Sequence, residues 1–152
     1  MLETALMYDT PLSVIPGMST RAFVLVSVGQ LDEAREMNER VRDYRTRVDR
    51  FSMGAGVWAI WSWQQLSTFD QTLAAMSDGR RTPWLEAAEA VAAEGWAAAA
   101  EVYARCGARG DEAFARLQAG GDDELRRALS FFREVEATRY IREAEAGLAA
   151  IA

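Results

Sequence analysis

The sequence contains no histidine and a single cysteine, and both shortages narrow the chemistry open to the chain. Histidine is the commonest general base, the usual activator of a nucleophile and the commonest metal ligand. One cysteine, Cys106, cannot form an internal disulfide and fits a reducing compartment. We therefore expect no catalytic, cofactor-binding or metal-binding residues and a protein that is not an enzyme.

Signals for export and for membrane insertion are also missing. The N-terminus lacks the basic segment and apolar core of a signal peptide. The longest apolar run, residues 53–63, is shorter than the about 20 residues that cross a bilayer. The net charge of −6 disfavours direct binding to nucleic acid or to anionic lipid, because both need a basic surface. We expect a cytoplasmic protein without these partners.

What the sequence does contain is a pattern of short, alanine-rich helices. Half of its residues are hydrophobic, which is typical of a globular protein. Thr82 and Pro83 are helix start signals, and the alanines of 87–93 predict a thin helix that ends at Glu94 and Gly95. Thin helices can approach closely, as they do in stacked helical hairpins. An ordinary hairpin of a small bundle fits the same pattern.

Two segments of the second half resemble a known family. Trp96, Ala99 and Tyr103 occupy the aromatic, small and aromatic positions of the second helix of a tetratricopeptide repeat, and we expect these three residues to serve packing. A resemblance to the C-terminal helical region of multidomain bacterial regulators is carried by WAAAAEVYARCGARGDEAFARL (96–117) and LRRALSFFREVEATRYIREAEAGLAA (125–150). In such regulators, a cyclase-like or winged-helix domain is joined to an ATPase and then to a tetratricopeptide-like solenoid.

The resemblance implies an all-α fold in which antiparallel hairpins stack into a tetratricopeptide-like superhelix. We expect about seven to eight helices in one domain over residues 1–152, with connections at 11–17 and 77–82. The resemblance also implies a non-enzymatic module for protein–protein interaction in a signalling or transcriptional regulator. The chain lacks the cyclase metal-binding carboxylates, the phosphate-binding Gly-Lys-Ser/Thr loop and a DNA-binding helix pair, so the activities of the larger relatives are not carried over.

The start of the chain predicts an exposed apolar edge. A partial helix before residues 11–17 lacks the polar cap that the end of a solenoid needs. We expect this edge to be covered by another protein, by a neighbouring domain of a longer chain or by a second copy of this chain.

A second predicted helix, over residues 31–51, carries alternating acids and arginines beside its apolar stripe. Such a pattern is typical of a solvated face with i,i+4 ion pairs. We favour this interpretation over an arginine-based phosphate site, because no glycine-rich loop accompanies the arginines.

The tryptophans of a long helix predicted over 57–76 are the leading candidates for function. Trp58, Trp61 and Trp63 make its first two turns apolar all round, which is typical of a helix buried on several faces. Tryptophan is also enriched in binding hot spots. We predict that any partner-binding surface is shaped by Trp58, Trp61, Trp63 and Tyr44, with Trp63 the most exposed ring. In an alternative hypothesis, the same tryptophans line an apolar pocket that senses a small ligand.

The remaining candidates for chemistry have structural explanations. Cys106 lies near a helix end and has no histidine to activate it, so we expect a buried thiol and not a reactive one. The adjacent carboxylates Asp122 and Asp123 are better explained as helix caps.

Overall fold

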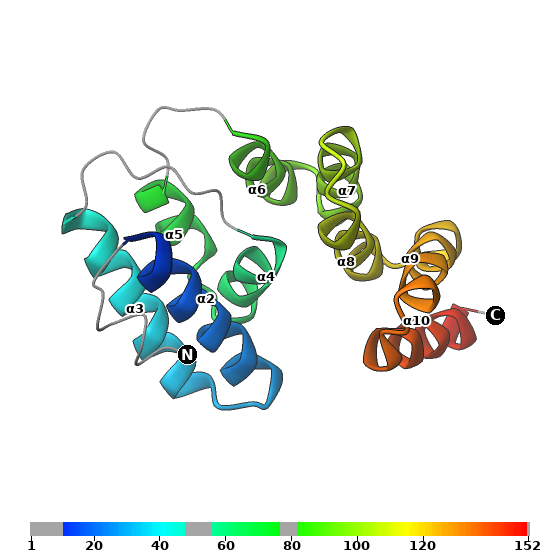
Figure 1. The fold of residues 1–152 in the computed structure, drawn as a ribbon, viewed down its shortest axis with the longest axis horizontal. Coiled ribbons are helices and arrows are strands. Elements are labelled where there is room, and N and C mark those ends of the chain that lie inside the picture. The colour runs from blue at the N-terminus through cyan, green and yellow to red at the C-terminus, as the bar shows by residue number, and fades with distance from the viewer. Residues whose placement is uncertain (1–10, 48–55, 77–81, 152) are drawn as a thin grey trace. The chain divides into compact units, whose positions relative to one another are not determined.

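The computed structural model describes residues 11–47, 56–76 and 82–151, and every regular element in these ranges is a helix. Nine helices are present in them, α2 to α10 (Figure 1). The all-α class is therefore confirmed. The helices belong to two compact units that divide between Arg80 and Arg81, where we expected one continuous repeat domain.

The first unit is a set of four helices around one core. It contains α2 (Pro11–Ser27), α3 (Leu31–Arg47), α4 (Val57–Gln65) and α5 (Phe69–Met76). Helix α2 packs against α3 and α4, and α5 packs against the same two helices. Each of the four helices therefore packs against two others of the set. Its core contains Val14, Ile15, Met18, Ala22, Leu25, Val26, Ala34, Met37, Val41 and Leu66.

The connection that we expected at residues 11–17 is wrong, because these residues form the beginning of α2. A proline inside a helix removes one hydrogen bond and crowds the preceding turn, and Pro16 lies in that position. Val14, Ile15 and Met18 are buried in the core of the unit. Their burial outweighs the local cost of Pro16. The apolar edge predicted for residues 1–10 lies outside the described residues.

The single long helix expected over 57–76 is in fact two helices. The chain turns at Ser67, whose φ of 56° is left-handed, and the N–H of Thr68 bonds to the carbonyl of Trp63 at 2.9 Å. Helix α5 is then held on α3 by the Asn38 amide, which donates to the hydroxyls of Thr68 at 2.9 Å and Thr72 at 3.4 Å. Neither glycine nor proline marks this turn in the sequence.

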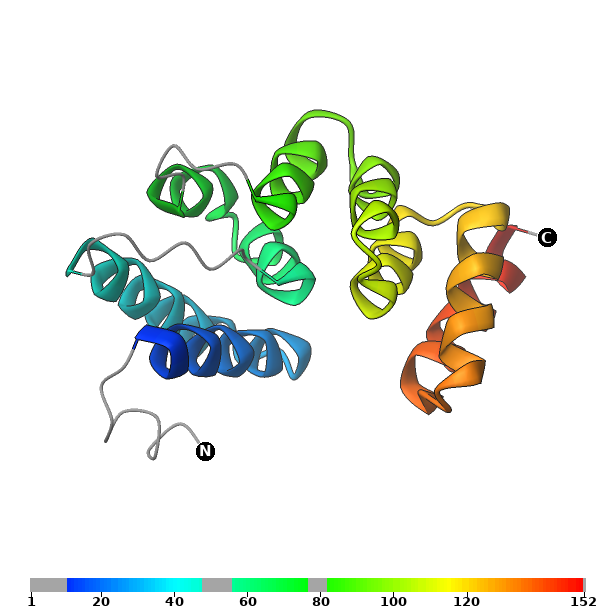
Figure 2. The same cartoon turned by 45° about the horizontal axis from the view of Figure 1, so that its top comes forward.

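The second unit is a linear row of five helices. It contains α6 (Pro83–Ala93), α7 (Trp96–Arg105), α8 (Arg109–Ala119), α9 (Asp122–Glu134) and α10 (Thr138–Ile151) (Figure 2). Each helix packs mainly against the next one in the chain. The expected start at Thr82 is confirmed, because its hydroxyl accepts the N–H of Leu85 at 3.2 Å. Residues 77–81 of the expected connection lie outside the described residues.

The spacing of these helices differs from that of a tetratricopeptide repeat. Pro83 and Arg109, the first residues of α6 and α8, are 26 positions apart, as are Trp96 and Asp122, the first residues of α7 and α9. A tetratricopeptide repeat takes 34 residues for its two helices. The hairpins of this unit are therefore shorter than those of the family that the sequence resembles.

The same backbone turn joins α2 to α3, α4 to α5, α7 to α8 and α9 to α10. In each turn, the third residue after the helix donates its N–H to a carbonyl five positions earlier, which satisfies one of the last carbonyl groups of the helix. One residue of each turn is left-handed, and these residues are Gly29, Ser67, Gly107 and Glu136.

Two glycines near one turn provide a test of this geometry. Gly107 has a φ of +72°, whereas Gly110 lies inside α8, and a Cβ at either position would meet no atom within 4 Å. We expect Gly107→Ala to lower the free energy of unfolding by about 1–2 kcal/mol, because only the backbone is strained. Gly110→Ala should raise it by about 0.5–1 kcal/mol through helix propensity. Urea denaturation measures the free energy of unfolding of both variants. Equal changes in this free energy would contradict the left-handed conformation of Gly107.

Candidate functional site

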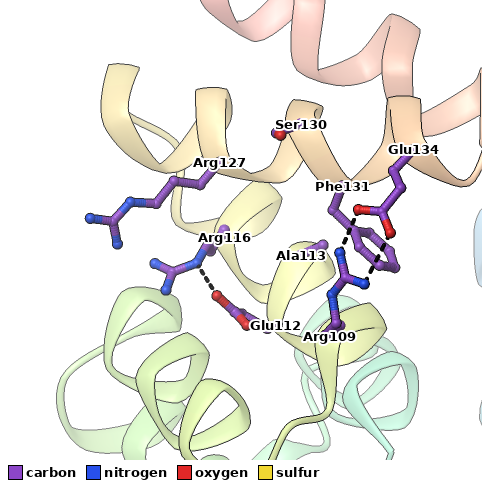
Figure 3. Close-up of a pocket in the computed structure, with 8 residues that line it drawn as sticks. All are labelled: Arg109, Glu112, Ala113, Arg116, Arg127, Ser130, Phe131 and Glu134. Atoms are coloured by element: carbon purple, nitrogen blue, oxygen red, sulfur yellow. Dashed lines mark hydrogen bonds and ion pairs between the residues drawn. The ribbon is translucent and has the colours of Figure 1, made fainter.

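Two stripes of side chains face each other across a cavity of about 190 Å³ between α8 and α9 (Figure 3). In both stripes the residues are three, four and seven positions apart, and such residues share one face of a helix. The α8 stripe consists of Arg109, Glu112, Ala113 and Arg116, and the α9 stripe of Arg127, Ser130, Phe131 and Glu134. The cavity therefore belongs to one pair of packed helices.

Arg116 is buried at one end of this cavity, with 4% of its surface exposed. Its Nε donates to Glu112 at 2.8 Å, its Nη1 to Glu124 at 2.6 Å and its Nη2 to Glu101 at 2.9 Å. A buried charge is tolerated only when it is paired and hydrogen bonded. Because Glu101, Glu112 and Glu124 belong to α7, α8 and α9, this one side chain ties three successive helices together.

The same carboxylates keep Arg116 charged. Burial acts to lower the pKa of its guanidinium, but the hydrogen bonds that it donates to Glu124, Glu112 and Glu101 act in the opposite sense and leave the pKa raised. Arg116 is therefore a fixed positive charge in the cavity wall and not a group that exchanges protons.

Arg109 and Glu134 form a paired, exposed group at the other end. The two Nη atoms of Arg109 donate to the two carboxylate oxygens of Glu134, and the Nη1 to Oε1 distance is 3.0 Å. The guanidinium also lies 5.2 Å from the centre of the Phe131 ring, within the range of a cation–π contact. The hydrogen bond from Arg109, and then its charge, lower the pKa of Glu134. The charges of Arg109 and Glu134 therefore neutralise each other.

Arg127 and Ser130 are the least engaged polar groups of the cavity. The Arg127 side chain is 61% exposed, and its Nη1 lies 3.9 Å from Oε1 of Glu101, which is long for an ion pair. That oxygen already accepts the hydrogen bond from Arg116. The exposed Ser130 makes no hydrogen bond through its hydroxyl within the described part of the chain. A guanidinium and a hydroxyl are thus available here to a polar group from outside.

The cavity offers hydrogen-bond donors and fixed charges. Glu112 and Glu134 both accept hydrogen bonds from arginines, and the chain has neither histidine nor lysine to activate Ser130. Among the residues that the structure describes, no cluster of three or more His, Cys, Asp or Glu side chains is placed to hold a metal ion. The arrangement is suited to binding a polar group.

The four residues that we predicted to shape a partner surface lie in the first unit, and they differ in exposure. Trp63 is buried, with 2% exposed, and it packs against Phe69 with ring centres 6.4 Å apart. The expectation that Trp63 is the most exposed of these rings is therefore wrong. Trp61 and Tyr44 are half-buried against the core, and Trp58 is the exposed ring, at 40%.

The packing residues of the resemblance are where we expected them. Ala99 and Tyr103 are fully buried, and Trp96 meets Phe114 edge to face, with ring centres 6.5 Å apart.

Cys106 and Asp122 differ from expectation. Cys106 is exposed, because it follows the last residue of α7 at the turn, where its thiol donates to the carbonyl of Tyr103. Gly121 occupies the cap position of α9, and Asp122 in the first turn binds Arg126 through both of its oxygens. Neither residue takes part in the cavity.

The sequence held one signal for the cavity that we did not use. Arg116 stands in α8 beside the buried residues Ala113 and Leu117, so it interrupts an apolar stripe with a charge. Glu112, four residues earlier, is positioned to pair with it. The contributions of Glu101 and Glu124 depend on how α7 and α9 pack and could not be read from spacing.

The fold and the site together define an all-α protein with a linear row of helices and an arginine-rich cavity in its second unit. Comparisons with protein-family models, with curated proteins and with solved structures found no match. Within the described ranges, no helix combines the length and apolar character that a bilayer crossing requires.

Proposed function

We propose that this chain is a helical-repeat module that binds another polypeptide and carries out no reaction of its own. The observation that carries the proposal is the order of packing in the second unit, where α6 to α10 contact mainly their neighbours in the chain. Arrays of this kind expose a continuous surface made from successive helices, and such surfaces bind extended partners.

The proposal includes a tetratricopeptide-like origin for the second unit. Its support is the placement of Ala99 and Tyr103 in the core and the repeated turn at the ends of α7 and α9. The 26-residue spacing is shorter than the 34 residues of the family's repeat. A role in a bacterial signalling or transcriptional regulator rests on the sequence resemblance alone.

The size of the cavity favours a polypeptide over a small metabolite. Pockets for small molecules usually enclose about 300–1,000 Å³. The α8–α9 cavity, at about 190 Å³, is smaller and is lined mainly by polar groups. It has room for a single side chain of a partner whose other residues lie on the neighbouring surface. The tryptophans of the alternative, ligand-sensing hypothesis do not line this cavity.

Selection from a random peptide library tests the proposal. The intact chain is immobilised, and displayed peptides of twelve residues are selected on it. Selected sequences are then synthesised, and their binding is measured by fluorescence anisotropy. We expect a shared sequence pattern and dissociation constants of about 1–100 μM, as for other short peptide segments. Failure to select any peptide that binds the folded chain more tightly than the urea-unfolded chain would contradict the proposal.

A further inference from the structure

We infer that the α8–α9 cavity receives a carboxylate from the bound polypeptide, with the guanidinium of Arg127 as its principal donor. This inference rests on the proposed function and adds to it the chemistry of one contact. The partner would present the side chain of an Asp or Glu residue at this point.

The first support is the uneven neutralisation of the three arginines. Arg109 shares two hydrogen bonds with Glu134, and Arg116 shares three with three glutamates. Arg127 has a 3.9 Å contact to an oxygen that Arg116 already holds at 2.9 Å. The positive charge of Arg127 is therefore the least compensated charge in the cavity wall.

The second support is the arrangement of donors around Arg127. A guanidinium has five N–H groups, and the three hydrogen bonds of Arg116 leave two of its N–H groups unused. The side chains of Arg116 and Arg127 extend in the same direction in Figure 3, away from the paired Arg109 and Glu134.

The charge balance favours a carboxylate over a phosphate. Glu101, Glu112, Glu124 and Glu134 surround the arginines, so a group with two negative charges would meet strong repulsion as well as attraction. A carboxylate carries one negative charge and needs one under-neutralised guanidinium and a few donors. The cavity supplies these groups and little positive charge beyond them.

The third support is that the arginine next to the site is held in place before any ligand arrives. Arg116 is buried and bonded to three helices, so it loses little freedom when another group binds nearby. Arg127 itself projects from α9, whose position against α8 is set by the Arg116 contacts. The helices that carry the site are therefore held together before a ligand binds.

The test uses the peptides selected on the intact chain and two arginine variants. We expect one acidic residue to recur at a fixed position of the selected peptides, and its replacement by Asn or Gln should weaken binding about tenfold or more. Arg127→Ala should cause a similar loss and should make the protein insensitive to that peptide substitution. Arg126→Ala is the matched control, because Arg126 is paired with Asp122 and does not line the cavity. It should change affinity less than about twofold.

The outcomes separate the two levels of the proposal. Peptides without a recurring acidic position, or additive losses from the peptide substitution and Arg127→Ala, would overturn the carboxylate site and leave the binding module standing. Tighter binding by at least about tenfold when phosphoserine replaces the acidic residue would also overturn it. If no peptide binds the folded chain, the proposed function itself fails. Circular dichroism confirms that both variants are folded, which is expected because both arginines are exposed.

Discussion

Replacement of Tyr103 by alanine is expected to lower the free energy of unfolding of the second unit by about 3–5 kcal/mol. Tyr103 is fully buried in α7, where its ring fills space beside the fully buried Ala99 and Ala100. Truncation removes the apolar contacts of the ring and leaves a cavity that small neighbours cannot fill. Urea denaturation followed by circular dichroism measures the loss. A loss below about 1 kcal/mol would contradict the placement of the Tyr103 side chain in the core.

Tyr103→Phe is the matched control, because the Tyr103 hydroxyl is buried without a hydrogen-bond partner among the described residues. Removing an unpaired polar group from a core should be neutral or stabilising. Burial, and then the charges of Asp111 and Cys106, raise the pKa of Tyr103. Ionisation is thus favoured in the unfolded chain, and stability should fall as the pH rises above the ordinary tyrosine pKa of about 10. The phenylalanine variant should show a smaller fall over the same pH range.

The start of α6 shows what local sequence signals can settle. Thr82 and Pro83 predicted the beginning of this helix correctly, since a hydroxyl cap and a fixed φ act over one turn of backbone. The same holds for the burial of Ala99 and Tyr103, because their spacing places them on one helical face. The all-α class follows from many such signals in agreement.

Predictions failed where tertiary packing overrides a local signal. Pro16 and Gly17 resemble a connection, yet the burial of Val14 and Met18 keeps them inside α2. At Ser67 the reverse occurs, since the chain turns although no glycine marks the position. The Asn38 side chain that bonds to Thr68 beside this turn belongs to a helix distant in the sequence. Neither effect is visible in a short window of sequence.

The side chains around the tryptophans show why exposure was misjudged. In one continuous helix over 57–76, an apolar stripe would run through Trp58, Leu66 and Phe69, and Trp63 would lie off it. The helix instead ends at Gln65, and Phe69 of α5 packs against Trp63. Trp58 lies on the stripe and is nevertheless exposed. Exposure depends on which helices arrive from elsewhere, and the same dependence hid the carboxylates that gather around Arg116.

Replacement of Arg116 by methionine is expected to destabilise the second unit by about 3 kcal/mol at pH 7, near the lower end for a broken buried ion pair. Methionine occupies a similar space but leaves Glu101, Glu112 and Glu124 close together without a positive charge. Because these carboxylates are partly exposed, water relieves some of the repulsion. Arg126→Met is the control, and its exposed pair with Asp122 should contribute little.

The pH dependence distinguishes this electrostatic effect from a packing defect. In the methionine variant, protonation of the crowded carboxylates removes their repulsion, so the deficit relative to the wild type should shrink as the pH falls from 7 towards about 4. Adding Glu124→Gln should recover part of the stability in the methionine background and cost stability in the wild type. Denaturation of the four proteins of this double-mutant cycle measures the coupling. A deficit that is independent of pH, with additive substitutions, would show that Arg116 acts through its volume alone and not as the charge that joins α7, α8 and α9.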